Sequence, residues 1–208
     1  MKKIFGMSIL YVLLISLLIA IITGSISGID QAVYQTLHKY LDNDFLNLVL
    51  SMLSAVFEPS NCLIMVLAIL AILFFVNRAK FWLLGFWSFC VFLIGTIMKY
   101  AIERPRPSAH FDGYSFPSMH VLSVCLVVSL VILVTRSSWA KVIGVILIAG
   151  IIVSRIFVHA HYFSDTLGSL LVMGIMLLTL NHQHLNALSD NRNTESETDT
   201  YNERYALY

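Results

Sequence analysis

The chain is too apolar for a soluble protein. Hydrophobic residues make up 58% of its 208 residues and charged residues only 12%, whereas about a quarter of the residues of a typical soluble domain are charged. The net charge of +1 gives no support for nucleic-acid binding. The composition therefore excludes an ordinary soluble domain and predicts an all-α, polytopic membrane protein.

Six apolar segments predict six transmembrane helices joined by short loops. Each is close to the roughly 20 residues that a helix needs to cross a bilayer. The segments are 4–29, 61–76, 81–99, 117–134, 142–160 and 165–180. The first also resembles a signal peptide, with Ser25-Ile26-Ser27 as the cleavage site. Because its apolar run is longer than a signal core, a retained helix is favoured.

Two segments between the first and second spans have a different character. Residues 30–43 carry charged residues among apolar positions at helical spacing, which predicts a helix lying in the membrane interface. Those apolar positions are Ile29, Val33, Leu37 and Tyr40. Residues 45–57 are apolar but short, so they form either a re-entrant helix or the first part of a long second span.

The chain becomes polar after residue 180, with mainly acidic charges toward its end. This composition predicts a disordered cytoplasmic tail over residues 181–208. The expected organisation is one six-span domain over residues 1–180, followed by that tail.

The basic residues of the short loops predict the orientation of the spans. If the amino terminus lies inside, every charged residue of the short inner segments is Lys or Arg, which satisfies the positive-inside rule. These residues are Lys2, Lys3, Arg78, Lys80, Arg136 and Lys141. The opposite loops mix basic with acidic residues. We therefore expect a multi-pass protein of the cell membrane with both termini in the cytoplasm.

Four groups of polar residues lie near the ends of the predicted spans. A charge deep in a bilayer costs roughly 2.5–3.5 kcal/mol, so such residues are functional candidates. The groups are residues 99–106, 118–120, 155–161 and Asp165. The ends of odd-numbered spans and the starts of even-numbered spans share one membrane face, so all four groups are expected to converge at the outer face.

The converging residues suit a multiply charged anion. Lys99, Arg104, Arg106 and Arg155 supply up to four cations, and arginine binds phosphate oxygens in a bidentate manner. Ser118 follows a proline at a predicted helix start, where free backbone N–H groups favour anions. The histidines and cysteines show no HExxH or CxxC spacing, so no metal is expected.

His161 and Asp165 are four residues apart and would share one face of a helical turn. The carboxylate would fix the imidazole tautomer and raise its basicity, which leaves the other ring nitrogen to act as a nucleophile or base. His159 lies off that face, so we expect it to be structural.

Three motifs resemble the signatures of the type 2 phosphatidic acid phosphatase superfamily, which includes membrane lipid phosphate phosphatases such as phosphatidylglycerophosphatase B and undecaprenyl diphosphatases. They are Lys99-x6-Arg106-Pro107, Pro117-Ser118-Met119-His120 and Ser154-Arg155-x5-His161-x3-Asp165. In that family the second motif has glycine where this chain has Met119. Glycine allows a close approach of backbone to phosphate, so the cradle is expected to differ at this point.

The resemblance implies a metal-independent phosphatase with no cofactor, working through a phosphohistidine. His161 would attack phosphorus, Asp165 would orient it, and His120 would protonate the leaving oxygen. Four residues would hold the phosphate oxygens, namely Lys99, Arg106, Ser118 and Arg155. Arg104 and Met119 are expected at the rim of the site.

Three functions fit these residues. The favoured one is dephosphorylation of a membrane lipid at the outer leaflet, with phosphatidylglycerol phosphate, phosphatidate and undecaprenyl diphosphate as candidate substrates. The alternatives are a lipid phosphotransferase that uses the same site and a non-catalytic phospholipid-binding membrane protein. The presence of both an acid, His120, and a nucleophile, His161, argues against the last. The expected partners are the lipid phosphate and the bilayer, not nucleic acid.

Overall fold

A computed structural model of the chain describes residues 2–41 and 43–180, and within these ranges every regular element is an α-helix. The all-α class predicted from composition is therefore confirmed. The helices are α1 Lys2–Ile22, α2 Ser27–Leu41, α3 Asp44–Val56, α4 Pro59–Val76, α5 Arg78–Ile102, α6 Met119–Thr135, α7 Ser138–Phe157 and α8 Phe163–Thr179. The tail predicted for residues 181–208 lies outside the described residues.

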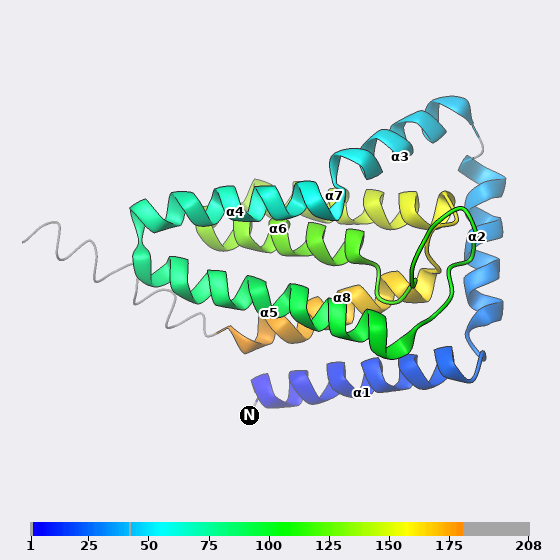
Figure 1. Cartoon of the computed structure of the whole chain (residues 1–208), viewed down its shortest axis with the longest axis horizontal. Coiled ribbons are helices and arrows are strands. Elements are labelled where there is room, and N and C mark those ends of the chain that lie inside the picture. Colours follow the sequence, from blue (N-terminus) through cyan, green and yellow to red (C-terminus); the bar gives the residue numbers. More distant parts are fainter. Residues whose placement is uncertain (1, 42, 181–208) are drawn as a thin grey trace, which may run out of the picture.

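The bundle along the long axis of the molecule consists of α1, α4, α5, α6, α7 and α8 (Figure 1). Helix α6 is at its centre, because it packs against α4, α5, α7 and α8, while α1 packs on α8. Residues 121–130 of α6 are all buried, as expected for a helix that is apolar on every side. Helix α2 runs across one end of the bundle, and α3 returns obliquely toward α4 (Figure 1).

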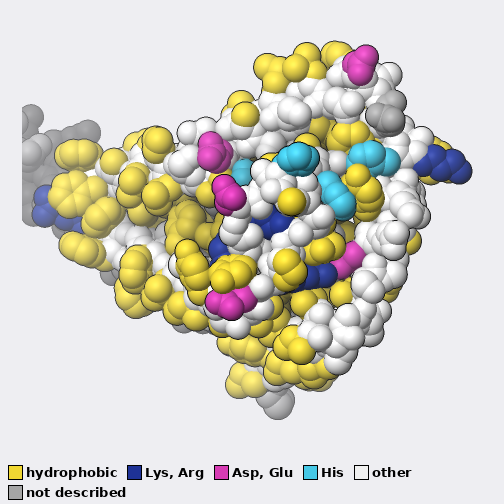
Figure 2. Space-filling view, turned by 45° about the vertical axis from the view of Figure 1, so that its right-hand side comes forward, with side chains coloured by type: hydrophobic (Ala, Val, Ile, Leu, Met, Phe, Trp, Pro, Cys, Tyr) yellow, Lys and Arg dark blue, Asp and Glu magenta, His cyan; other side chains and the backbone are white. Residues whose placement is uncertain are grey.

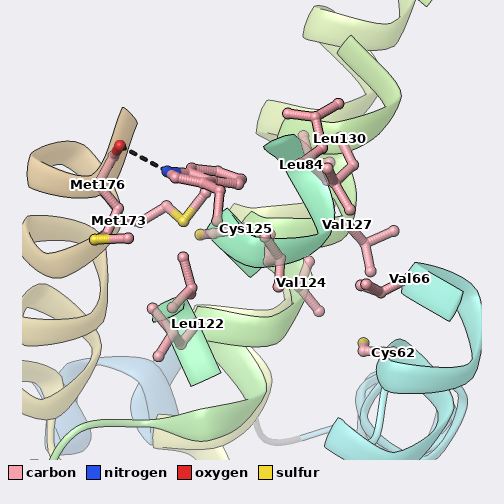
Figure 3. Close-up of a cluster of buried hydrophobic side chains, with 14 of the residues drawn as sticks. Cys62, Val66, Leu84, Leu122, Val124, Cys125, Val127, Leu130, Met173 and Met176 are labelled. Atoms are coloured by element: carbon pink, nitrogen blue, oxygen red, sulfur yellow. Dashed lines mark hydrogen bonds between the residues drawn. The ribbon is translucent and has the colours of Figure 1, made fainter. Parts of the chain in front are cut away.

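The core lies between α4, α5, α6 and α8 (Figure 3). Leu122 and Leu126 of α6 have no exposed surface, and Val66 of α4 and Leu84 of α5 are almost fully buried. The indole nitrogen of Trp87 donates a 2.9 Å hydrogen bond to the Met176 carbonyl, which ties α5 to α8. Cys62 and Cys125 are buried, while Cys90 is half-buried.

Among the described helices, α1, α4, α5 and α7 are long and apolar enough to span a membrane. Helices α6 and α8 are apolar but have 17 residues each. Five of the predicted spans each correspond to one helix, whereas predicted span 4–29 is divided, because α1 ends at Ile22 and α2 starts at Ser27. The number of spans that cross the bilayer stays a prediction. Large apolar side chains are exposed on the outside of the bundle, including Phe75, Trp82 and Trp139, and a surface of this kind fits contact with lipid.

The segment between α1 and α4 differs in detail from its prediction. Helix α2 forms where an interfacial helix was expected, but Ile29 and Tyr40 of its predicted apolar face are exposed and Asp30 is buried. Helix α3 is separate from α4, since the chain turns at Phe57 and Pro59 starts the next helix, a position that proline favours. Residues 45–57 are therefore not the first part of one long helix.

Candidate active site at the α2 end of the bundle

The four predicted polar groups come together at the end of the bundle that α2 crosses. They lie at the end of α5, the start of α6, the end of α7 and the start of α8, and the loop of residues 103–118 covers the same end (Figure 1). With this end turned forward, basic, acidic and histidine side chains gather around a hollow, while hydrophobic side chains cover the flank (Figure 2). The convergence follows from the alternating direction of successive helices.

His161 and Asp165 meet at the start of α8. Asp165 is in the first turn, where its Oδ2 accepts a 2.9 Å hydrogen bond from the backbone N–H of Tyr162. That capping interaction fixes the carboxylate. The same Oδ2 lies 3.5 Å from Nδ1 of His161. Both side chains are buried, with 2% of His161 and none of Asp165 exposed, so the imidazole has little freedom to turn.

The second ring nitrogen of His161 faces a guanidinium group. Nη1 of Arg106 is 3.4 Å from Nε2 of His161 and also donates to the Ala160 carbonyl at 3.1 Å. Burial is the main reason why the pKa of His161 falls to about 4, with Arg106 and Arg155 adding to the decrease and Asp165 opposing it. The imidazole is therefore neutral at pH 7. With its proton on Nδ1 toward Asp165, Nε2 carries the free lone pair.

Two arginines and His120 line a cavity of about 430 Å³ between α3, the 103–118 loop and the bundle. Nη1 of Arg155 donates a 2.5 Å hydrogen bond to the Ser54 hydroxyl of α3. The ring of Phe111 lies 5.6 Å from the Arg155 guanidinium and 5.9 Å from that of Arg106. These contacts hold both guanidinium groups in place, and burial lowers the pKa of Arg106. A pair of partly desolvated arginines is a strong anion site.

Ser118 is held directly before α6. Its N–H donates to the Asp165 carbonyl at 3.3 Å, and its own carbonyl accepts from the Ser169 hydroxyl at 2.9 Å. The preceding Phe116 packs against Gly168 so closely that a Cβ there would lie 2.3 Å from the ring. Glycine at 168 thus allows the 116–118 turn to rest on α8.

Several buried donors of the site have no hydrogen-bond partner among the described residues. They are Ser118 Oγ, Arg106 Nε and Arg155 Nε, and Nδ1 of His161, 3.5 Å from Asp165, also makes no hydrogen bond. Buried polar groups are normally paired. An oxyanion placed between them would supply the acceptors, so the donor set fits phosphate.

Lys99 connects the site to its covering loop. Its Nζ donates a 2.6 Å hydrogen bond to the Tyr114 carbonyl, and the hydroxyl of Tyr114 donates to Glu103 at 3.0 Å. A lysine ammonium has three donors, so the loop contact leaves N–H groups for an anion. Glu103 stabilises the loop.

Arg104 and Met119 were expected at the rim of the cavity, but both lie away from it. Arg104 is on the far side of Asp165, to whose Oδ1 its Nη1 donates at 2.6 Å. Met119 packs between α6 and α5, since a Cβ added to Gly95 would lie 3.0 Å from its sulfur. Its half-buried side chain packs against the core.

Asp30 and Ser54 belong to none of the three motifs, yet both contact site residues. Asp30, Tyr34 and His38 are spaced four apart in α2, and this polar stripe could have signalled the packed face of the helix. Ser54 has no comparable signal, because a single serine in an apolar helix is common. His159 stacks on Tyr34 with ring centroids 4.0 Å apart, consistent with a structural role.

Comparison with known proteins supports both the motifs and the fold. The profile of the PAP2 superfamily matches residues 63–189. The crystal structure of the first transmembrane PAP2-type phosphatidylglycerolphosphate phosphatase, from Bacillus subtilis, is 22% identical with a TM-score of 0.70, covering 84% of this chain and 94% of that one. LpxE from Aquifex aeolicus is 14% identical with a TM-score of 0.56, covering 71% of this chain and 92% of that one. No curated protein sequence matches the chain.

Proposed function

We propose that this chain, which belongs to the PAP2 superfamily, removes phosphate from a membrane lipid by way of a phosphohistidine at His161. The proposal is based on the surroundings of the buried His161 imidazole. Its Nδ1 faces the Asp165 carboxylate, and its Nε2 faces the Arg106 guanidinium. A neutral imidazole held in this way presents a lone pair to an anion bound by the arginines.

The reaction would proceed in two displacements at phosphorus. Nε2 of His161 attacks, the bond between phosphorus and the ester oxygen breaks, and His120 donates a proton to the departing oxygen. A water molecule then gives its proton to His120 and attacks the phosphohistidine, which releases phosphate and restores His161. Charge on the transferring group would be stabilised by Lys99, Arg106, Ser118 and Arg155.

The substrate would be a phosphate ester or diphosphate whose tail stays in the bilayer. The apolar outer surface of the bundle would contact lipid, and the cavity of about 430 Å³ would hold a headgroup. The neighbour from B. subtilis is named as a phosphatidylglycerolphosphate phosphatase. Phosphatidylglycerol phosphate, phosphatidate and undecaprenyl diphosphate are the substrates to test.

The test is phosphate release by the purified protein from these three lipids. We expect His161→Ala to abolish turnover, because Nε2 of His161, which faces Arg106, is the proposed attacking atom. His159→Ala is the matched control and should keep most of the activity, since its ring stacks on Tyr34 of α2. An inactive His159→Ala with an active His161→Ala would refute the assignment. A new phosphoester in place of free phosphate would indicate a phosphotransferase.

We further propose that the lysine and arginine side chains replace metal ions in neutralising the phosphate. A chelator should then leave phosphate release unchanged, and vanadate, which can mimic five-coordinate phosphorus, should inhibit it. Activity that a chelator removes and magnesium restores would contradict the metal-independent mechanism.

A further inference from the structure

Asp30 is a buried carboxylate on a helix outside the segment that the family profile matches. It lies in the first turn of α2, and only 1% of its side chain is exposed. The profile begins at residue 63, so membership of the family assigns no role to α2. Buried carboxylates are rare unless they are paired.

The side chain of Asp30 contacts Arg104 and Ser164, which lie next to the proposed catalytic pair of His161 and Asp165. Its Oδ2 is 2.8 Å from Nη2 of Arg104 and accepts from the Ser164 hydroxyl at 2.7 Å. Its Oδ1 accepts from the Ser164 N–H at 2.8 Å. Nη1 of the same Arg104 donates to Asp165 Oδ1 at 2.6 Å. One guanidinium therefore bridges two carboxylates that are 135 positions apart in the chain.

The bridge fixes the carboxylate that faces His161. Asp165 uses Oδ1 for Arg104 and Oδ2 for the Tyr162 N–H and His161. The plane of the guanidinium is held from one side by the Tyr162 ring, whose centroid is 3.9 Å away. If Asp30 were neutral, Arg104 would lose one of its two anionic partners and could turn away from Asp165.

The bridge also has an electrostatic consequence. Two carboxylates share one guanidinium, which leaves a net negative charge behind Nδ1 of His161. When Nε2 becomes bonded to phosphorus, the ring gains positive charge, and a fixed negative charge behind it stabilises that state. Without the charge of Asp30, the pair of Arg104 and Asp165 would be neutral.

We propose that Asp30 is a positioning residue of the active site: acting through Arg104, it holds Asp165 in place and so sets the orientation of His161. The inference rests on the proposed role of His161 in catalysis. Asp30 is not needed merely to dock α2, because Tyr34 and His38 of the same helix stack on His159 and Phe157. Helix α2 is thus part of the support of the site.

Kinetics of Asp30→Asn test this role. We expect kcat to fall by roughly 10- to 100-fold, by analogy with the loss of groups that orient metal ligands, with KM changed less than about threefold. Asp30→Glu should recover part of the loss. Asp44→Asn, an equal charge change at an exposed position in the first turn of α3, should have no effect. An unchanged kcat in Asp30→Asn, or an equal loss in Asp44→Asn, would overturn the proposal.

A double-mutant cycle tests whether Asp30 acts through Arg104. Lysine cannot bridge two carboxylates as a guanidinium does, so Arg104→Lys should lower kcat about as much as Asp30→Asn. The double variant should then be no slower than Arg104→Lys alone, because both changes break one bridge. Independent, multiplying losses would contradict the bridge. If Asp30→Asn does not fold, Asp30→Glu and Arg104→Lys decide the matter, since full activity in both would exclude the role.

Chemical modification of His161 does not depend on turnover, so it tests the positioning role of Asp30 separately from the proposed phosphatase activity. The rate at which diethyl pyrocarbonate modifies His161, followed by peptide mass spectrometry, should rise severalfold in Asp30→Asn as the ring loses its fixed orientation. Exposed His110 is the internal standard and should not change. A higher rate at His161 in a protein that hydrolyses no lipid phosphate would uphold the positioning role and reject the phosphatase. An unchanged rate at His161 would reject the positioning role.

Discussion

His161 has a combination of properties that burial alone would not produce. Its imidazole is almost fully enclosed, yet it lies between a carboxylate and a guanidinium. Burial outweighs the carboxylate, so the pKa falls to about 4. A nucleophile has to be unprotonated, and this environment keeps the ring neutral across the physiological range.

The low pKa of His161 predicts a pH dependence of stability. In the unfolded chain the imidazole has its ordinary pKa of about 6.5, so between pH 6.5 and 4 the unfolded chain binds a proton that the folded protein does not. The contribution of His161 is fully present above pH 6.5 and decreases as the pH falls, by up to about 1.4 kcal/mol per pH unit. Thermal unfolding in detergent from pH 7.5 to 4.5 would measure the decrease.

His161→Gln is the control for this measurement, because glutamine does not titrate. The difference in melting temperature between wild type and His161→Gln should be constant above pH 6.5 and should shift against the wild type below it. A difference that stays constant down to pH 4.5 would show that the folded protein protonates His161 as readily as the unfolded chain.

Helix α3 contains none of the three motifs, yet it contacts the proposed phosphate site. The buried side chain of Ser54 in α3 accepts a hydrogen bond from the Arg155 guanidinium. Without α3, the Arg155 guanidinium would lose both its partner and one wall of the cavity. Helix α3 is therefore part of the proposed binding site, although its own sequence is nearly featureless.

Ser54→Ala should lower kcat/KM by roughly tenfold, because a hydrogen bond to a charged group contributes about 1.5–3 kcal/mol and part of it will be replaced by water. The loss should lie mainly in KM, since the arginine would still be present but less well placed. Ser60→Ala, at an exposed position near the start of α4, is the control. Equal kinetics for Ser54→Ala and wild type would show that Arg155 does not depend on α3.

The direction of the whole bundle decides which leaflet supplies the substrate. Near the two ends of the described chain, Nζ of Lys3 donates a 3.3 Å hydrogen bond to the Leu180 carbonyl. The site is at the other end of the bundle (Figure 1). The positive residues of the short loops predict that the chain ends lie inside. We therefore propose that the site opens to the outer leaflet.

Cysteine labelling in intact cells measures this orientation. A cysteine at Ala109, exposed in the loop over the site, should react with an impermeant thiol reagent, and one at Ser138, exposed at the start of α7, should not. Half-buried Cys90 is replaced by alanine first, and Cys62 and Cys125 are buried. Labelling at Ser138 alone would place the site in the cytoplasm and make inner-leaflet lipids the substrates.

The sequence by itself determined the helices and where the motifs meet. Apolar segments such as 61–76 and 142–160 become helices because a backbone in an apolar environment has to satisfy its own hydrogen bonds. The spacing of four predicts that His161 and Asp165 meet, although His161 lies in the bend just before α8 and not within the helix. The four polar groups converge because successive helices run in opposite directions, so this result depends only on the order of the segments.

The tertiary structure decided which polar residues support the site. Asp30 contacts Ser164 across 134 positions, and Ser54 contacts Arg155 across 101. No local periodicity encodes such pairs, because they depend on the angle at which α2 and α3 cross the end of the bundle. Arg104 illustrates the reason. From its neighbours in the sequence, Arg104 would be a cation of the loop at the rim of the site. In the structure it lies between the carboxylates of Asp30 and Asp165, which come from two different helices, and therefore bridges them.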